Sequence, residues 1–207
     1  DDQNNNQQYK NADPATNQIW TIEHGPQGGD ELNLMQSGIN YGWPVITYGV
    51  NYGTGTKIGE GTHKNNMSQP VYYWVPSIAT SSLLFYNGEK FPDWKGDVFV
   101  SSLKFGQLAR LEILDNKVIQ EERLINGAAG RIREVKEGPD GLLYILIDDT
   151  NGKLLIITLS KQYVVENKSN PIMFDKDGLT IDSKSRIEPV SSKKKEAKKS
   201  KKKESVN

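Results

Sequence analysis

Short apolar runs alternate along the chain with turns rich in Gly, Pro, Asn and Asp. No stretch carries a sustained helical period, and short runs bounded by such turns are typical of β-strands. We predict strands at 19–23, 45–48, 83–86, 97–103, 107–114, 117–125, 131–136, 142–148 and 153–159. The pattern therefore predicts an all-β fold, which could be a sandwich, a barrel or a propeller.

A weak internal repeat favours the propeller. Residues 14–23 and 139–148 each read as a proline turn, an apolar-aromatic strand and a final carboxylate, and 92–100 is a looser third copy. Pro92 and Pro139 are 47 residues apart, which is within the range of one propeller blade. The Gly- and Tyr-rich segment 49–70 would then be a long loop inside an earlier blade. Three short copies still leave a sandwich open.

The two ends of the chain differ in composition from the middle. Residues 1–12 are polar and rich in Asn and Gln, and we predict no regular structure there. Residues 161–207 hold 13 of the 26 Lys and Arg residues but only 7 of the 26 Asp and Glu residues. The net charge of zero thus combines an acidic body with a basic tail. We expect a flexible lysine-rich tail, which would either contact an anionic surface or only aid solubility.

Several classes of protein are excluded or disfavoured. The chain has no cysteine, so it has no disulfides and no thiolate metal site. It has no apolar run long enough for a transmembrane segment. No aromatic residue interrupts the lysines of 191–204, which argues against specific nucleic-acid binding. The chain begins without a methionine or an apolar leader, so a signal peptide removed on export stays open.

Four charged residues form the first candidate site. Arg131 and Arg133 are two residues apart on a predicted strand, so their side chains point to the same face. With Lys104 and Asp148 from neighbouring strands, they could hold a small polyanion such as a cofactor with several carboxylates. By spacing alone, solvated charges on a sheet rim are the commoner explanation.

The second candidate site is the turn that follows the predicted strand 19–23. Gly25-Pro26 forces a turn and leaves carbonyl oxygens free, because Pro26 has no N–H. These carbonyls and the carboxylates of Asp30 and Glu31 suit Ca²⁺, which accepts mixed oxygen ligands. The same residues would also make an ordinary turn. His24 lies beside them, and a lone histidine is more often structural than catalytic.

The ordered segments together resemble the quinoprotein glucose/sorbosone dehydrogenases, which are soluble aldose sugar dehydrogenases that use pyrroloquinoline quinone (PQQ). The matching segments are 20–26, 28–33, 40–44, 74–79, 85–86, 91–97, 102–104, 122–124, 130–135 and 138–148. The resemblance implies a six-bladed β-propeller with PQQ and Ca²⁺ at one end of its channel. This chain would contain about three blades, in residues 13–160.

The resemblance also implies roles for the two candidate sites. Lys104, Arg131 and Arg133 match residues that bind the carboxylates and quinone oxygens of PQQ, and Asp148 matches an acid of the same pocket. The other matching positions are His24, which lines the cofactor, Gly25 and Pro26, which give carbonyls to Ca²⁺, and Asp30 and Glu31, near a possible second calcium site.

The implied reaction is oxidation of an aldose at its C1 hydroxyl, by hydride transfer to PQQ with the help of Ca²⁺. An external electron acceptor and a periplasmic or secreted location follow from the same resemblance. The family chain is about twice as long, and this sequence corresponds to its C-terminal half. The histidine that acts as general base lies in the other half, and His63 is in the wrong place to replace it. We therefore assign no catalytic residue and expect the isolated chain to be inactive.

Two other functions stay open. The chain could be a non-catalytic propeller remnant that binds a partner or a surface. It could also be a calcium-dependent sugar lactonase, although the sequence lacks the cage of metal-binding side chains that such a reaction needs.

Overall fold

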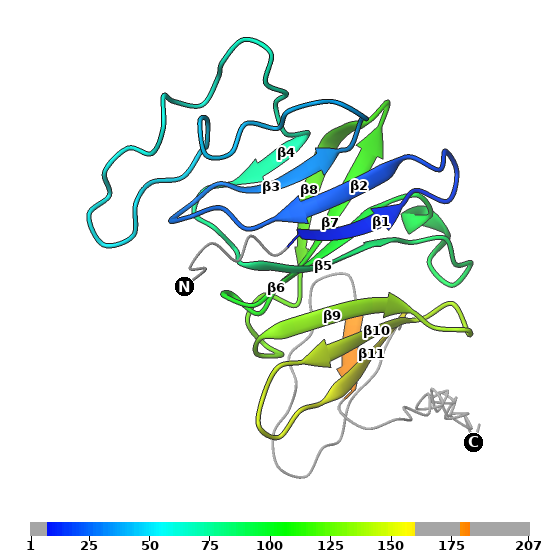
Figure 1. The fold of residues 1–207 in the computed structure, drawn as a ribbon. Helices are drawn as coiled ribbons and strands as arrows, with labels where there is room; N and C mark the ends of the chain where they lie inside the picture. Colours follow the sequence, from blue (N-terminus) through cyan, green and yellow to red (C-terminus); the bar gives the residue numbers. More distant parts are fainter. Residues whose placement is uncertain (1–7, 160–178, 183–207) are drawn as a thin grey trace, which may run out of the picture.

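The computed structural model describes residues 8–159 and 179–182, which form three antiparallel sheets of four strands each (Figure 1). The first sheet contains β1 (Gln8–Ala12), β2 (Ile19–Glu23), β3 (Asp30–Leu34) and β4 (Tyr72–Trp74). The second contains β5 (Thr80–Phe85), β6 (Val98–Ser102), β7 (Leu108–Leu114) and β8 (Lys117–Leu124). The third contains β9 (Ile132–Glu137), β10 (Leu143–Ile147), β11 (Leu154–Leu159) and β12 (Leu179–Asp182).

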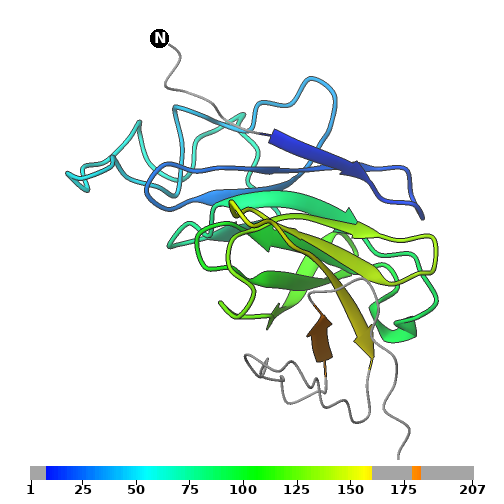
Figure 2. The same ribbon diagram turned by 90° about the horizontal axis from the view of Figure 1, so that it is seen from below.

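The sheets follow one another as the blades of a β-propeller. Neighbouring strands of each sheet are consecutive in the sequence, and the first strands of successive sheets touch, β1 against β5 and β5 against β9. Figure 2, a view from below, shows the same succession of sheets. The predicted partial propeller of about three blades is therefore confirmed, and the sandwich is not. Among the described residues, no helix is long and apolar enough to cross a membrane.

The middle blade is buried on both faces. Leu83 and Val100 belong to an apolar cluster shared with the first blade, whereas Leu84 and Phe99 belong to a second cluster shared with the third blade. Successive side chains of a strand point to opposite faces, so a strand that is covered on both sides must be apolar without interruption. This is why 83–86 and 98–100 read as continuous apolar runs in the sequence.

The proline repeat marks the same place in each blade. Pro14 precedes β2, the short 3-10 helix Pro92–Trp94 precedes β6, and Pro139 precedes β10. All three positions lie in the connection from the first to the second strand of a blade. The repeat found in the sequence therefore corresponds to the structural repeat.

Several sequence predictions differ from the structure, and β3 and β4 correspond to no predicted strand. Gln8–Ala12 forms β1, paired in register with β2, within the segment for which we predicted no structure. Its polar Asn11 is accommodated because Asn11 Nδ2 donates to the carbonyl of Leu83 on β5, at 3.0 Å. Leu179–Asp182 likewise forms β12, which pairs with the edge of β11, whereas the rest of the predicted tail lies outside the described residues. Residues 45–48 form no strand, and only an isolated bridge joins Ile46 to Gly61.

The long segment between β3 and β4 is the predicted loop. It extends away from the sheets at the upper left of Figure 1, drawn in cyan. Isolated bridges such as Gln27 with Val50 tie it to the turn that follows β2.

Candidate functional site

A residue of the predicted site lies one or two positions after the second strand of each blade. His24 follows β2, Lys104 lies two residues after β6, and Asp148 follows β10. Because the blades repeat, these three positions come to one edge of the structure, and Figure 1 shows β2 and β10 both running toward the left. The connections between blades reach the same edge, since the N–H of Lys104 donates to the carbonyl of Ile78 at 3.1 Å and that of Asp148 to Arg131 at 2.8 Å.

Arg131 and Arg133 converge on one carboxylate. Arg131 donates from Nε and Nη2 to Asp148 Oδ2, at 3.2 and 3.1 Å, and Arg133 donates from Nη2 to the same oxygen at 2.7 Å. These hydrogen bonds, those from Arg131 first, lower the pKa of the Asp148 carboxyl. The arginines are 57% and 37% exposed, so the remaining N–H groups of both can reach a ligand. We call Arg131, Arg133 and Asp148 the clamp.

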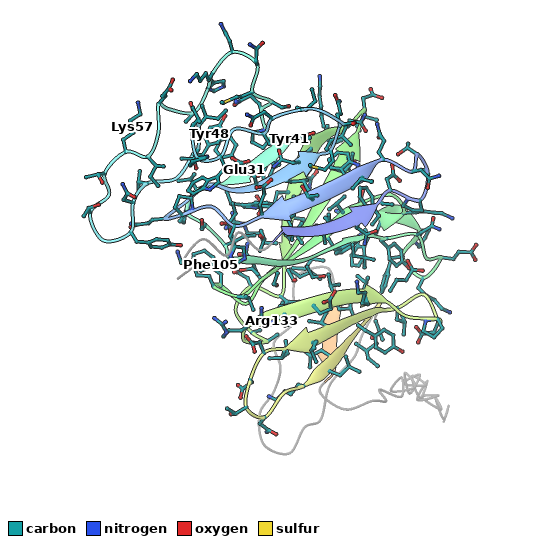
Figure 3. All side chains as sticks on the ribbon, in the orientation of Figure 1. Glu31, Tyr41, Tyr48, Lys57, Phe105 and Arg133 are labelled. Carbon is teal, nitrogen blue, oxygen red and sulfur yellow. The ribbon has the colours of Figure 1, made fainter. Side chains whose placement is uncertain are left out.

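The turn that carries Lys104 touches the connection that carries Arg131. Gly106 has a φ of +57°, and a Cβ at this position would lie 2.2 Å from the carbonyl oxygen of Gly130. Gly127 N–H also donates to the carbonyl of Gly106 at 3.1 Å. Backbone therefore packs on backbone here, which is possible only without a side chain on Gly106. Figure 3 labels Phe105, which follows Lys104, and Arg133 on the same side of the molecule.

Lys104 adds an available positive charge to this edge. Its side chain is exposed, its Nζ lies 5.1 Å from the centre of the Phe105 ring, and it has no ion-pair partner among the described residues. Taken together, the three cations Lys104, Arg131 and Arg133 and the one carboxylate of Asp148 carry a net charge of two positive. Such a surface fits a ligand with several carboxylates, such as PQQ.

A β-bulge sets the direction of the Arg133 side chain. In the pairing of β9 with β10, Glu134 faces Leu146 and Ile132 faces Ile147, so Arg133 is an extra residue without an opposite partner. A bulge bends the strand and redirects a side chain. Strand alternation in the sequence predicted that both arginines share a face, and they do meet at Asp148. The bulge itself could not be predicted from the sequence.

The predicted calcium turn is held in place by Asp30. Asp30 is 1% exposed, and its Oδ1 accepts a hydrogen bond from the N–H of Gly25 at 2.9 Å while its Oδ2 accepts one from the N–H of Thr80 at 3.3 Å. The ring of His24 donates from Nε2 to the carbonyl of Thr80. Asp30 thus links the turn after β2 to the inner strand of the next blade. This gives Asp30 a structural role that the sequence did not predict.

The carbonyl of Pro26 is already engaged by protein groups. It accepts hydrogen bonds from Tyr52 Oη at 3.0 Å and from Ser77 Oγ at 3.2 Å. A Ca²⁺ ion bound to this oxygen would have to displace at least one of the two hydroxyls or share the oxygen with them. Oxygen donors of the kind that Ca²⁺ prefers are present, so the turn fits the ion in chemistry. No group of three or more His, Asp or Glu side chains suited to a metal occurs among residues 8–159 and 179–182.

Glu31 forms a carboxylate pair with Glu23, a residue that the sequence did not assign to the site. The two face each other across β2 and β3, and Asn33 Nδ2 donates to Glu23 Oε1 at 2.9 Å and to Glu31 Oε2 at 3.3 Å. Burial raises the pKa of both carboxyls, that of Glu31 to about 7. Both residues line a small cavity that Tyr41 also borders, and Figure 3 labels Glu31 and Tyr41 near each other. A cation bound beside these two neighbouring carboxylates would be attracted by both.

Known proteins are similar to this chain in sequence and in fold. Residues 4–156 match the family model described as Glucose / Sorbosone dehydrogenase. The chain is 43% identical over 155 residues to aldose sugar dehydrogenase YliI of Escherichia coli K12, an alignment that covers 74% of this chain and 42% of the relative. A crystal structure of a glucose dehydrogenase superposes with a TM-score of 0.68 and 44% identity, over 72% of this chain and 43% of that one. The PQQ-bound form of an aldose sugar dehydrogenase from Streptomyces coelicolor, at 22% identity and a TM-score of 0.54, shares the fold, over 72% of this chain and 41% of that one. The chain thus spans less than half the length of these relatives.

Proposed function

The chain belongs to the glucose/sorbosone dehydrogenase family, and we propose that it supplies the cofactor-binding half of a PQQ-dependent aldose sugar dehydrogenase. The observation that carries the proposal is the convergence of Arg131 and Arg133 on Asp148. Lys104, which forms no ion pair in the described part of the chain, lies at the same edge. A strand-end acid that holds two guanidinium groups fixes them before a ligand arrives. Such preorganisation is what binding of a rigid polyanion requires.

Each part of the site would have a defined task. Lys104, Arg131 and Arg133 would bind the carboxylates and quinone oxygens of PQQ, and their charge would also stabilise negative charge that develops there. The turn at Gly25 and Pro26 would offer carbonyls to Ca²⁺. When bound, PQQ would supply hydride acceptance from the C1 hydroxyl of an aldose, with Ca²⁺ as Lewis acid.

The remaining residues of the proposed site would support these groups. His24 would line the cofactor beside the metal, in the orientation that its bond to Thr80 gives it. Asp30 would hold the turn, and Glu31 would contribute to a second calcium site together with its neighbour Glu23.

We propose that the sugar's hydroxyl proton is taken by a group outside the described residues. His24 uses its Nε2 to bond the carbonyl of Thr80, and His63 lies exposed in the long loop, in contact with the hydroxyl of Thr62. Within the described residues, no hydrogen bond, ion pair or ring contact joins either histidine to Arg131, Arg133 or Asp148. The chain alone should therefore bind PQQ but not oxidise sugars. By family resemblance, the complete enzyme would be periplasmic or secreted and would pass electrons to an external acceptor.

Binding of PQQ tests the proposal directly. Calorimetry of the chain with PQQ and Ca²⁺ should give one binding event, and the double variant Arg131→Gln/Arg133→Gln should bind at least about a hundredfold more weakly, since it loses charge-assisted hydrogen bonds worth about 1.5–3 kcal/mol each. Arg123→Gln is the matched control, because Arg123 is also exposed and also pairs with a carboxylate, Glu121, on the outer strand β8. It should bind as the unchanged chain does.

Two results would overturn the proposal. One is an equal effect of the double variant and of Arg123→Gln on PQQ affinity. The other is no binding by the unchanged chain, which would favour the non-catalytic remnant. Oxidation of an aldose by the isolated chain, with PQQ and Ca²⁺ added, would refute the proposed inactivity alone.

A further inference from the structure

A buried serine of the middle blade contacts the backbone between the two arginines of the clamp. Ser81 is 0% exposed, and its Oγ donates to the carbonyl of Ile132 at 2.7 Å. Ile132 lies between Arg131 and Arg133 and is itself fully buried. The contact joins the inner strand of one blade to the inner strand of the next.

A second buried serine contacts this hydroxyl. Ser101 Oγ lies 2.8 Å from Ser81 Oγ and is also 0% exposed. Since the hydrogen of Ser81 points to Ile132, Ser101 must be the donor in the contact between the two hydroxyls. The result is a short chain of hydrogen bonds from Ser101 through Ser81 to the backbone of β9.

Ser81 is the extra residue of a bulge, as Arg133 is. In the pairing of β5 with β6, Thr80 faces Ser102 and Ser82 faces Ser101, which leaves Ser81 without an opposite partner. Two bulged residues in neighbouring inner strands thus lie close together, near the start of each strand. A bulge interrupts the ladder that would otherwise fix the strand. A side-chain bond to the carbonyl of Ile132 restores a fixed position where the ladder is interrupted.

We propose that Ser81 is a positioning residue for the clamp, which holds the backbone of Ile132 where both flanking guanidinium groups reach Asp148. Without this hydroxyl, the bulged start of β9 has more freedom, and the two arginines no longer share one oxygen of Asp148. The relation of Ser81 to PQQ affinity rests on the proposed function, whereas its relation to the clamp does not.

The experiment compares Ser81→Ala with Ser101→Ala in the full chain. Both variants remove one buried serine hydroxyl from the same network, so both should lower stability, but only Ser81→Ala removes the bond to Ile132. The first measurement is the pKa of Asp148, by NMR titration of its carboxyl carbon. In Ser81→Ala this pKa should rise toward the ordinary value of an aspartate, because the arginine hydrogen bonds that lower it are loosened. In Ser101→Ala it should stay low.

The second measurement is PQQ affinity, which should fall about five- to tenfold in Ser81→Ala and less than about twofold in Ser101→Ala. An Asp148 pKa that is equal in both variants and in the unchanged chain would overturn the inference. If the unchanged chain does not bind PQQ, the proposed function fails, but the carboxyl titration still decides the role of Ser81. If Ser81→Ala does not fold, Ser81→Cys keeps the volume with a weaker donor; it should raise the pKa in the same direction, and no rise would overturn the inference.

Discussion

Replacement of Asp30 by alanine should destabilise the protein through two unsatisfied N–H groups. Asp30 is buried, and its two oxygens accept hydrogen bonds from the N–H groups of Gly25 and Thr80. A buried donor left without an acceptor costs about 1–3 kcal/mol. We take about 1 kcal/mol for Gly25, which is half-buried, and about 2 kcal/mol for Thr80, which is fully buried. Asp30→Ala should thus lose about 3 kcal/mol of unfolding free energy.

Urea unfolding followed by tryptophan fluorescence measures this loss, and Asp140→Ala is the matched control. Asp140 also accepts two hydrogen bonds, from the N–H of Leu142 at 3.1 Å and from Tyr144 Oη at 2.9 Å, but it is exposed. Water can take the place of the exposed Asp140 carboxylate as hydrogen-bond acceptor. The control should therefore lose about 0.5 kcal/mol of unfolding free energy at most. Equal losses in the two variants would refute the reasoning, since burial is the only property that should separate them.

Two further predictions follow from the carboxylate pair and from Gly106. Because burial raises the pKa of Glu31 from 4.5 to about 7, the folded state keeps a proton that the unfolded chain releases, so stability should fall as pH rises through that window. Urea unfolding measured at several pH values, with a metal chelator present, should show this fall in stability with pH. Glu31→Gln should flatten the dependence, whereas an unchanged dependence would assign it to Glu23. The second prediction is that Gly106→Ala loses more than about 2 kcal/mol of unfolding free energy, because the added Cβ would collide with the backbone of Gly130. Gly53→Ala, with a φ of +74° but open space, should lose only about 1 kcal/mol, and equal losses would contradict the steric argument.

The strands from β6 to β11 could be predicted closely from the sequence. The apolar runs at 107–114 and 142–148 correspond to β7 and β10 within a residue at either end. These strands bury their side chains in the two clusters, so their pattern is set by packing. The prolines in the connections before β2, β6 and β10 also act locally, because a proline fixes its own backbone φ angle whatever surrounds it.

The parts that the sequence did not reveal depend on contacts from distant residues. The strand β1 is stabilised by pairing with β2 and by the bond from Asn11 to Leu83, 72 residues away, so its polar composition was misleading. The bulges at Ser81 and Arg133 arise from pairing registers, which no local pattern encodes. Asp30 was predicted as a metal ligand because carboxylates suit Ca²⁺, and its bond to Thr80 is visible only once two blades are packed.

The equivalent strand ends show how chemistry is distributed over the blades. His24, Lys104 and Asp148 follow the second strand of successive blades, so one location in the repeating unit holds an imidazole, an ammonium and a carboxylate. None of these side chains belongs to the two apolar clusters. Each blade can therefore exchange its functional group with little effect on packing. In an architecture of repeated units, such positions allow the units to differ in function while they stay alike in structure.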